Sequence, residues 1–331
     1  MRTRREPCRK TAPAFSVKED VDMGRYVLNK VLIAIATVFV LATATFFLMK
    51  LIPGDPFANL KTKAAVQEKQ REYYGLDRPV AEQYVRYMGN LLRGDLGWSL
   101  KKAGRSVVDI IREGFPVSAK LGLTSLVFSV MIGLLFGILC AQYRNRWPDY
   151  LLMLVAVLGI ALPSMVLGPL MRYFFGVRLK WLPVVGWGTP DKMIMPAIVL
   201  GLGTVAGETR SMRASMLGVM TQDYITTARA KGLSPVQVVA RHEIKNSLVP
   251  IVTGLGIRIA SIMMGSFVVE SMFLIPGLGR YFVDSITNLD YPLIMGLTIF
   301  YGSFLVTMNL LVDVAYGLLD PRIRESGRKG D

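Results

Sequence analysis

The feature that most constrains this chain is a set of apolar segments long enough to cross a lipid bilayer. The first runs from Val31 to Met49, and five more cover roughly residues 119–141, 150–172, 193–214, 249–271 and 291–317. About 20 apolar residues in a helix match the thickness of the hydrocarbon core. A helix also satisfies its own backbone hydrogen bonds there. The sequence therefore predicts an all-α polytopic membrane protein with six transmembrane helices.

Composition and charge agree with a membrane protein. Hydrophobic residues make up 52% of the 331 residues, which is high for a soluble domain of this length. The net charge of +15 comes from basic residues in the N-terminal arm, the loops and the C-terminal tail, so we interpret it as orientation and not as nucleic-acid binding. With two cysteines and one histidine, we expect no disulfide framework and no metal site.

Loop charges predict how the chain is oriented. If the six segments alternate, the basic N-terminal arm, the turn with Arg144 and Arg146, the loop with Arg229 and Lys231, and the basic tail share one side. Short basic loops stay in the cytoplasm. Both termini are therefore predicted to be cytoplasmic. The segment at about 52–117 then lies outside, and at roughly 60 residues it is long enough to escape the charge rule.

A polar stretch from Asp223 to Pro250 lies between the fourth and fifth apolar segments. Tyr224–Lys231 has a helical composition, and Gly232 can adopt the left-handed conformation that ends a helix. Ser234 can cap a second helix that has Pro235 in its first position. This pattern predicts a helical elbow at the membrane surface, shaped to dock a soluble partner.

The second helix of this elbow is predicted to be amphipathic. Helical spacing places Val236, Val239 and Ala240 on one apolar side. The polar residues that recur on the opposite side are Gln237, Arg241 and Lys245.

The sequence of the elbow resembles that of a known family. ARAKGLS, followed by His242, Asn246 and Pro250, is similar to the cytoplasmic coupling loop of the dipeptide and oligopeptide subfamily of bacterial ABC-importer permeases. The general family form has Glu-Ala-Ala, three residues and then Gly. Aligned on Gly232, only Ala228 of that triplet matches, because Thr226 and Thr227 replace the others. The resemblance therefore rests on the residues typical of the peptide subfamily and not on the general family motif.

Further stretches resemble the same subfamily in the same order. They are IPGDP at 52–56, YGLDRPVAEQY at 74–84, GDLGWS at 94–99, WLPVVGWG at 181–188, GSFVVESMFLIPGLGRYFVDSI at 265–286, DYPLIMG at 290–296 and LLDPRIR at 318–324. The resemblance covers nearly everything after residue 25 and is greatest for the B-type permease subunits.

This resemblance implies a type I ABC importer permease fold. The expected organisation is a basic cytoplasmic arm at 1–25, a first transmembrane helix at 26–51, an extracytoplasmic segment at 52–117, a permease core at 118–324 with its coupling loop at 221–248, and a tail at 325–331. The expected location is the cytoplasmic membrane of a bacterium or archaeon.

The implied function is that of a permease subunit in an ATP-driven, binding-protein-dependent importer of dipeptides or oligopeptides. The implied partners are a homologous second permease, two cytoplasmic ATPases, an extracytoplasmic solute-binding protein, membrane lipid and the peptide itself. ATP and Mg would be used by the ATPases, with no cofactor on this chain. The alternatives are a permease for another small solute, such as nickel or glutathione, and an ion-coupled secondary carrier.

Enzymatic activity is not expected. The sequence contains no G-x-x-x-x-G-K-[ST] phosphate loop, no H-E-x-x-H and no G-x-S-x-G motif. We therefore predict no catalytic residues, and the energy for transport must come from a partner.

Two sets of residues are candidates for function. The resemblance implies ATPase coupling by Thr227, Ala228, Arg229, Ala230, Lys231, Gly232, Leu233, Ser234, Pro235 and Gln237. The candidates for the translocation pathway or its gate are Arg258, Glu270, Pro276, Gly277 and Gly279.

Charges inside apolar segments leave alternatives open, since an ionisable group at membrane depth is costly unless paired or hydrated. Arg258 either faces an aqueous pathway or pairs with Glu208. Glu270 meets a substrate amine, caps an outer gate, or is a carboxylate at the lipid interface. Asp313, Arg210 and Arg213 are expected to form a structural salt-bridge cluster near the cytoplasmic ends of their helices.

Overall fold

The structure is a computed structural model that describes residues 19–51, 68, 72–75, 77–102 and 104–319. The described residues are helical apart from turns and one isolated bridge between Trp98 and Ser106. The main helices are α1 (Glu19–Leu51), α3 (Val80–Leu92), α4 (Val107–Gln142), α5 (Trp147–Ala161), α6 (Ser164–Met171), α7 (Pro190–Met220), α11 (Val249–Met272), α12 (Leu278–Thr287) and α13 (Tyr291–Leu319). The predicted basic arm, Cys8, the IPGDP stretch and the basic tail lie outside the described residues.

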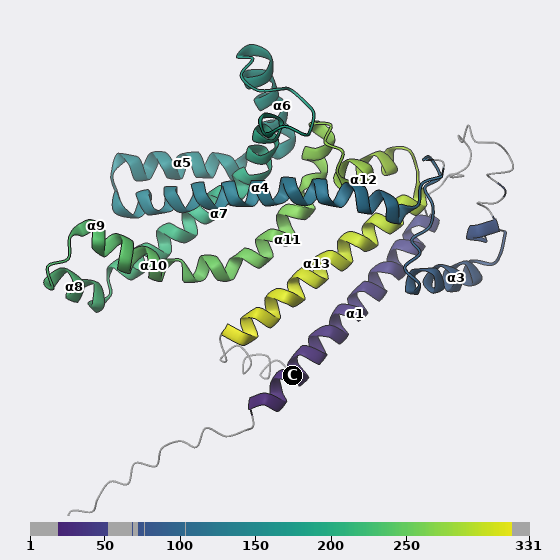
Figure 1. Ribbon diagram of the computed structural model, residues 1–331, viewed down its shortest axis with the longest axis horizontal. Coiled ribbons are helices and arrows are strands. Elements are labelled where there is room, and N and C mark those ends of the chain that lie inside the picture. The colour runs from purple at the N-terminus through teal and green to yellow at the C-terminus, as the bar shows by residue number, and fades with distance from the viewer. Residues whose placement is uncertain (1–18, 52–67, 69–71, 76, 103, 320–331) are drawn as a thin grey trace, which may run out of the picture.

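Helix α4 is the centre of the fold and packs along most of α7 (Figure 1). Three hydrophobic clusters follow one another along α4. The cluster centred on Ile110 joins α4 to α12 and α13, and the clusters centred on Leu121 and on Ala141 both join α4 to α7 and α11. The bundle is thus held together by a core that runs along its whole length.

Two glycines of α4 allow it to approach α7 closely. A Cβ on Gly133 would lie 2.4 Å from the Cβ of Glu208, and a Cβ on Gly137 would lie 2.5 Å from that of Met212. Small residues four positions apart are a frequent means of close helix packing in membranes. Any side chain at these two positions would force α4 and α7 apart.

All six predicted apolar segments are helical, but only some pass a test of length and hydropathy for crossing a membrane. Among the described residues, Val27–Leu51, Val107–Gln142 and Tyr291–Val314 pass it alone. Helix α5 and the segment Ser164–Arg178 pass it only as a bent pair. Helices α7 and α11 occupy the other two predicted positions.

The third predicted segment, residues 150–172, is not one continuous helix but a bent pair of helices. The chain bends by 108° between α5 and α6. Leu162 has an extended ψ of 112° and precedes Pro163. A residue before proline is disfavoured in the helical region, which explains the break. The π-helical segment η1 (Arg172–Arg178) continues α6.

The second predicted segment begins earlier than expected. Helix α4 starts at Val107 and contains Pro116 in its interior, whereas the sequence placed the helix from about 119. Ser106 caps α4 by accepting a hydrogen bond from the Asp109 amide at 3.0 Å. The first turns of α4 therefore belong to the same helix as the apolar span.

The expected salt-bridge cluster of Asp313, Arg210 and Arg213 does not form, and this prediction is wrong; two of the three residues pair separately with other partners. Arg213 of α7 donates through Nε and Nη2 to the buried Asp149 of α5, at 2.8 and 2.7 Å. Asp313 of α13 pairs with Lys30 of α1 at 2.7 Å, joining two helices that lie side by side in Figure 1. Arg210 is exposed and belongs to neither pair.

Candidate functional site

Polar structure gathers at the two opposite ends of the helical bundle. At one end lie α3 and α12, and at the other lies the elbow of α8 (Asp223–Ala230), α9 (Pro235–Val238) and α10 (Ile244–Ser247) (Figure 1). The π-helical segment η2 (Val239–Glu243) joins α9 to α10.

At the first end, the GDLGWS and DYPLIMG motifs meet although they are far apart in the sequence. The Asp290 side chain is buried and accepts hydrogen bonds from the Ser99 hydroxyl and from the Leu100 amide at 3.0 Å. A carboxylate that accepts backbone amides fixes loop geometry firmly. Asp290 therefore anchors this loop to the start of α13.

Tyr74 joins the YGLDRP stretch to the same loop. Its hydroxyl donates to the Trp98 carbonyl at 2.9 Å and accepts from the Trp98 amide at 2.8 Å. The predicted turn glycines have positive φ, +76° at Gly94 and +86° at Gly97. A Cβ on Gly97 would lie 2.6 Å from the Tyr74 hydroxyl, so the residue must be small.

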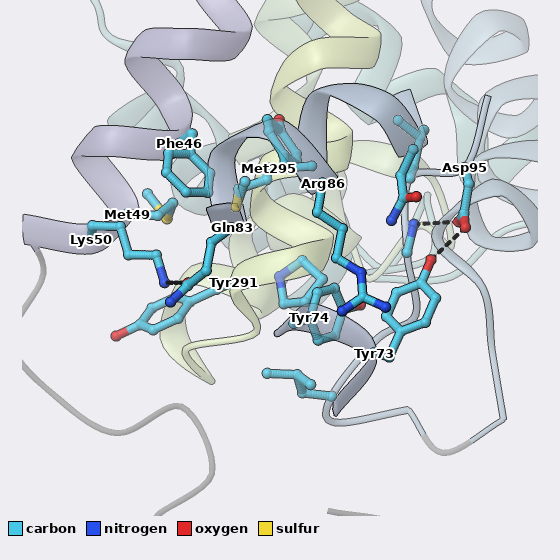
Figure 2. Close-up of a pocket in the computed structure, with 16 residues that line it drawn as sticks. Phe46, Met49, Lys50, Tyr73, Tyr74, Gln83, Arg86, Asp95, Tyr291 and Met295 are labelled. Carbon is cyan, nitrogen blue, oxygen red and sulfur yellow. Dashed lines mark hydrogen bonds between the residues drawn. The ribbon is translucent and has the colours of Figure 1, made fainter. Parts of the chain in front are cut away.

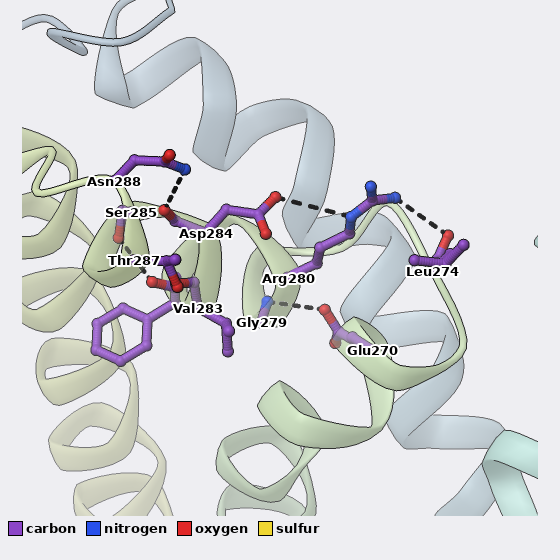
Figure 3. A network of polar contacts seen from close by, with 10 residues as sticks. Glu270, Leu274, Gly279, Arg280, Val283, Asp284, Ser285, Thr287 and Asn288 are labelled. Carbon is purple, nitrogen blue, oxygen red and sulfur yellow. Dashed lines mark hydrogen bonds and ion pairs between the residues drawn. The ribbon is translucent and has the colours of Figure 1, made fainter. Parts of the chain in front are cut away.

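The PGLG turn, a gate candidate, packs against the end of α11. The buried Glu270 carboxylate accepts a hydrogen bond from the Gly279 amide at 2.7 Å (Figure 3). A Cβ on Gly277 would lie 2.3 Å from Oε2 of Glu270, and one on Gly279 would lie 2.6 Å from the Cα of Phe267. Neither glycine has a positive φ, so backbone conformation does not require glycine there. The close approach of neighbouring atoms does, because it leaves no space for a side chain.

Glu270 thus caps a neighbouring helix. The first amides of a helix lack partners within it, and a carboxylate there is favoured by the helix dipole. Because Glu270 is buried in this arrangement, a position at the lipid interface does not describe it in this structure. Pro276 is the first residue of the PGLG turn and lies between the end of α11 and the start of α12.

We expect Glu270→Ala to loosen the start of α12, because the Gly279 amide loses its hydrogen-bond acceptor at a cost of about 1–3 kcal/mol. Hydrogen exchange of the amides at Gly279 and Arg280 should speed up roughly tenfold or more. Glu270→Gln keeps an acceptor oxygen and should retain most of the protection. Unchanged exchange in Glu270→Ala would contradict this role.

At the other end, the predicted caps of the elbow are confirmed. Gly232 has a φ of +80°, and its amide closes the turn after α8 by donating to the Arg229 carbonyl. Ser234 and Gln237 form a reciprocal capping box, and Pro235 occupies the first turn of α9.

The predicted apolar side of the second helix is wrong in part. Val236 is 75% exposed and Ala240 is also exposed, whereas Val238 is 1% exposed and packs with Ile225 and Ala228. The face of α9 that carries Val238 packs on α8, which leaves Val236 on the exposed side. The polar side, with Gln237, Arg241 and Lys245, is exposed as predicted.

Glu243 was missed in the sequence. It is 1% exposed, and its carboxylate accepts from Gln142 at the end of α4 at 2.8 Å and from Arg229 of α8 at 3.2 Å. The elbow is therefore fastened to α4 by a buried charge. A glutamate that follows Arg241 and His242 looks like an ordinary polar position, so no sequence signal distinguished it.

Most of the predicted coupling residues form one exposed surface. Ala228 is buried in the small elbow core, and Leu233 is half-buried against it. The exposed members are Thr227, Arg229, Ala230, Lys231, Gly232, Ser234, Pro235 and Gln237. Tyr224, at 44% exposure, and Val236 extend the same segment with apolar surface.

Arg258 pairs with the wholly buried Glu208. Its Nε lies 2.5 Å from Oε1 of Glu208, which joins α11 to α7. Within the described residues, both carboxylate oxygens of Glu208 and Nη1 of Arg258 lack a hydrogen bond of good geometry. Gly254, one turn earlier on α11, leaves room for the guanidinium. The pairing that the sequence left open is formed.

The described residues contain no group of three His, Cys, Asp or Glu side chains that could hold a metal ion. They define an all-helical membrane protein with a polar cap at one end, a buried ion pair between its helices, and a helical elbow with an exposed small-residue surface at the other end.

Comparisons with known proteins assign the family. Residues 133–325 match the model "Binding-protein-dependent transport system inner membrane component", and residues 23–122 match the model of its N-terminal region. The chain belongs to this family, so it is the membrane-embedded permease component of an ABC importer.

Curated relatives span almost the whole chain. The dipeptide transport system permease protein DppB of Bacillus subtilis is 47% identical over 303 residues, covering 91% of this chain and 98% of that one. The oligopeptide transport system permease protein OppB of Haemophilus influenzae is 40% identical, covering 91% and 100%. The glutathione transport system permease protein GsiC of Escherichia coli K12 is 39% identical, covering 91% and 99%.

A solved structure of the MetNI methionine ABC transporter, in inward-facing conformations, is similar over 66% of this chain and 96% of that chain. The TM-score is 0.49 and the sequence identity is 19%.

Proposed function

We propose that this chain forms half of the translocation pathway of an importer for dipeptides or oligopeptides. The observation that carries the proposal is the near full-length similarity to permeases named for dipeptide and oligopeptide transport. The pathway is shared with a homologous second permease, and two cytoplasmic ATPases and an extracytoplasmic solute-binding protein complete the assembly. ATP and Mg bind to the ATPases, and this chain has no ATPase site.

The proposed topology has six spans with both termini in the cytoplasm. It is supported by the contact between Gln142, beside the basic turn with Arg144 and Arg146, and Glu243 of the elbow. Two basic loops thus lie together at one end of the bundle, as the charge rule requires of cytoplasmic loops. The cap anchored by Asp290 lies at the opposite end and faces the binding protein.

The elbow is proposed to couple transport to ATP hydrolysis. Motion is transmitted only through groups that contact both moving parts. The exposed surface from Thr227 to Gln237 has short side chains that suit entry into a cleft of an ATPase. On its other side, the elbow is fastened to α4 through Glu243 and to α7 and α11 through the cluster of Ala141, Met216 and Ile251. A push on the elbow therefore reaches the central helices.

The pathway itself is proposed to run beside α11. ATP binding would close the ATPase pair and rock the helix bundles, so that the pathway opens alternately to each side. Glu270, Pro276, Gly277 and Gly279 hold α12 onto α11, so movement of α11 carries α12 with it. We propose this unit as the outer gate.

The second candidate is a permease for glutathione, because GsiC is similar over the same length. Substrate selection rests largely with the binding protein. Uptake assays with the cognate binding protein, using a dipeptide, an oligopeptide and glutathione as competitors, separate these cargoes.

The test of the coupling role is cross-linking from the elbow. We expect the purified complex to contain ATPase subunits, and Val236→Cys to cross-link to one of them. Val85→Cys on α3 is the matched control, since Val85 is 70% exposed and Val236 75% exposed, at opposite ends of the bundle. Val85→Cys should not cross-link to an ATPase. Cross-linking from Val85 alone, or a chain that transports without ATPases, would overturn the proposal.

A further inference from the structure

A cavity of about 230 Å³ lies between α1, α3 and α13, away from the proposed coupling and gate residues. Figure 2 shows the side chains around it, which come from these three helices, from Tyr73 and Tyr74 before α3, and from the loop before α4. Its walls are largely apolar, with Phe46, Met49, Leu96 and Met295 among the lining residues. The volume is below the range of about 300–1,000 Å³ typical of pockets that enclose a whole ligand. It suits the head of a longer molecule.

Two cations line this cavity without an ion-pair partner among the described residues. Lys50 donates one of its three N–H groups to Gln83, and Arg86 donates through Nη1 to the Glu72 carbonyl at 3.1 Å. The acidic residue that lines the cavity, Asp95, already accepts from the Tyr73 hydroxyl and from the Gly97 amide. The cavity therefore carries net positive charge.

Two tyrosine hydroxyls in the lining are also unsatisfied. The hydroxyl oxygens of Tyr87 and Tyr291 are buried and have no hydrogen-bond partner in the described part of the chain. Buried hydroxyls are nearly always hydrogen-bonded, so each such exception calls for a missing partner. Burial raises the pKa of the Tyr87 hydroxyl, so that it remains a donor at neutral pH. Lys50, Arg86, Tyr87 and Tyr291 together offer donors to an anion.

The position of the cavity indicates where the anion comes from. The apolar span of α1 ends at Leu51, so Lys50 lies at the level where lipid headgroups begin. Phe39 lies two turns before Phe46 on the same side of α1 and is 54% exposed. An acyl chain can pack against Phe39 while its headgroup enters the cavity. Basic pockets between transmembrane helices bind anionic headgroups in this manner.

We propose that the cavity binds the phosphate headgroup of an anionic phospholipid from the leaflet on the α3 side. The phosphate accepts hydrogen bonds from Lys50, Arg86 and the two tyrosine hydroxyls. The bound lipid fastens α3 and its loop to α1 and α13, where aromatic contacts of Tyr84 and Tyr87 with Phe46 already join α3 to α1.

The test is native mass spectrometry of the whole transport complex, purified in detergent and titrated with phosphatidylglycerol or phosphatidylcholine. We expect phosphatidylglycerol to bind preferentially, and Arg86→Gln to lower its affinity about tenfold or more, since a hydrogen bond to a charged group is lost. Arg93→Gln is the matched control. Arg93 directly follows α3 and is exposed, but it does not line the cavity, so the affinity should not change.

A second variant is needed because Arg86 also donates a hydrogen bond to the Glu72 carbonyl, so that Arg86→Gln could lower lipid binding by disturbing the fold. Tyr87→Phe combined with Tyr291→Phe removes only two hydroxyls and should lower the affinity several-fold. The proposal is overturned if neither variant changes binding, if phosphatidylcholine binds equally well, or if inorganic phosphate at millimolar concentration displaces the lipid completely. The last result would assign the cavity to a soluble anion.

Discussion

Replacing Gly232 by aspartate is expected to leave the protein in the membrane and to abolish uptake. Gly232 has a φ of +80°, where a side chain costs about 1–2 kcal/mol, and less for aspartate. A Cβ there meets nothing within 4 Å in this chain, so the fold tolerates the added atoms. A partner protein packed against the elbow, however, has no room for the added side chain. Overpacking an interface costs about 1–3 kcal/mol, which weakens ATPase association roughly tenfold or more.

The measurement is the amount of ATPase that co-purifies with the tagged permease, together with uptake of a labelled peptide. Gly104→Asp is the matched control, since Gly104 has a φ of +74° and also an open surrounding, but lies in the loop before α4. It carries the same backbone strain and should retain ATPase and uptake. If Gly232→Asp transports normally, or if Gly104→Asp loses ATPase equally, the elbow is not the coupling surface.

Removing Arg258 is expected to have the largest effect on stability. Arg258→Met leaves the Glu208 carboxylate buried without its cation, at a cost of about 3–5 kcal/mol. The yield of folded protein in size-exclusion chromatography and the midpoint of thermal unfolding should both fall. Arg210→Met is the control, because Arg210 is an exposed arginine of the partner helix α7 with no ion pair among the described residues.

The double variant decides between the two roles of Arg258. Glu208→Gln with Arg258→Met removes both charges, so most of the lost stability should return. If uptake also returns, the pair is structural. If the double variant folds but does not transport, Arg258 also serves the pathway. A double variant no more stable than Arg258→Met, or a single variant as stable as the parent, is incompatible with the ion pair seen here.

The sequence predicted the elements of this protein better than their geometry. All six apolar segments are helical, although a bend of 108° divides the third, and the caps at Gly232 and Ser234 formed where local chemistry placed them. The size of the bend at Pro163 could not be read from the sequence, because the apolar run continues through the proline. The apolar side of the elbow was misassigned at Val236, since the sequence does not show which face of α9 packs against Ile225 and Ala228.

For the candidate site too, the sequence indicated some residues but not the contacts that they make. The small residues around Gly232 and the charges Arg258 and Glu270 stood out in the sequence because they are unusual where they occur. Glu208 was named as one of two options for Arg258, and the structure forms that pair. Ser118 and Glu243 did not stand out, since they are distant or unremarkable in the chain. The Leu278 amide donates to Ser118 Oγ at 2.9 Å across 160 positions, and no local pattern predicts such a contact.

By itself, the sequence determined that this chain is a helical membrane protein with a polar elbow, because hydropathy, turn residues and caps act over a few neighbouring positions. Only the tertiary structure decided which buried charges meet, which side of the elbow is exposed, and that Asp290 anchors a loop near residue 100. The physical reason is range. Helix formation is set by local backbone energetics, whereas ion pairs and cavities depend on how distant helices pack.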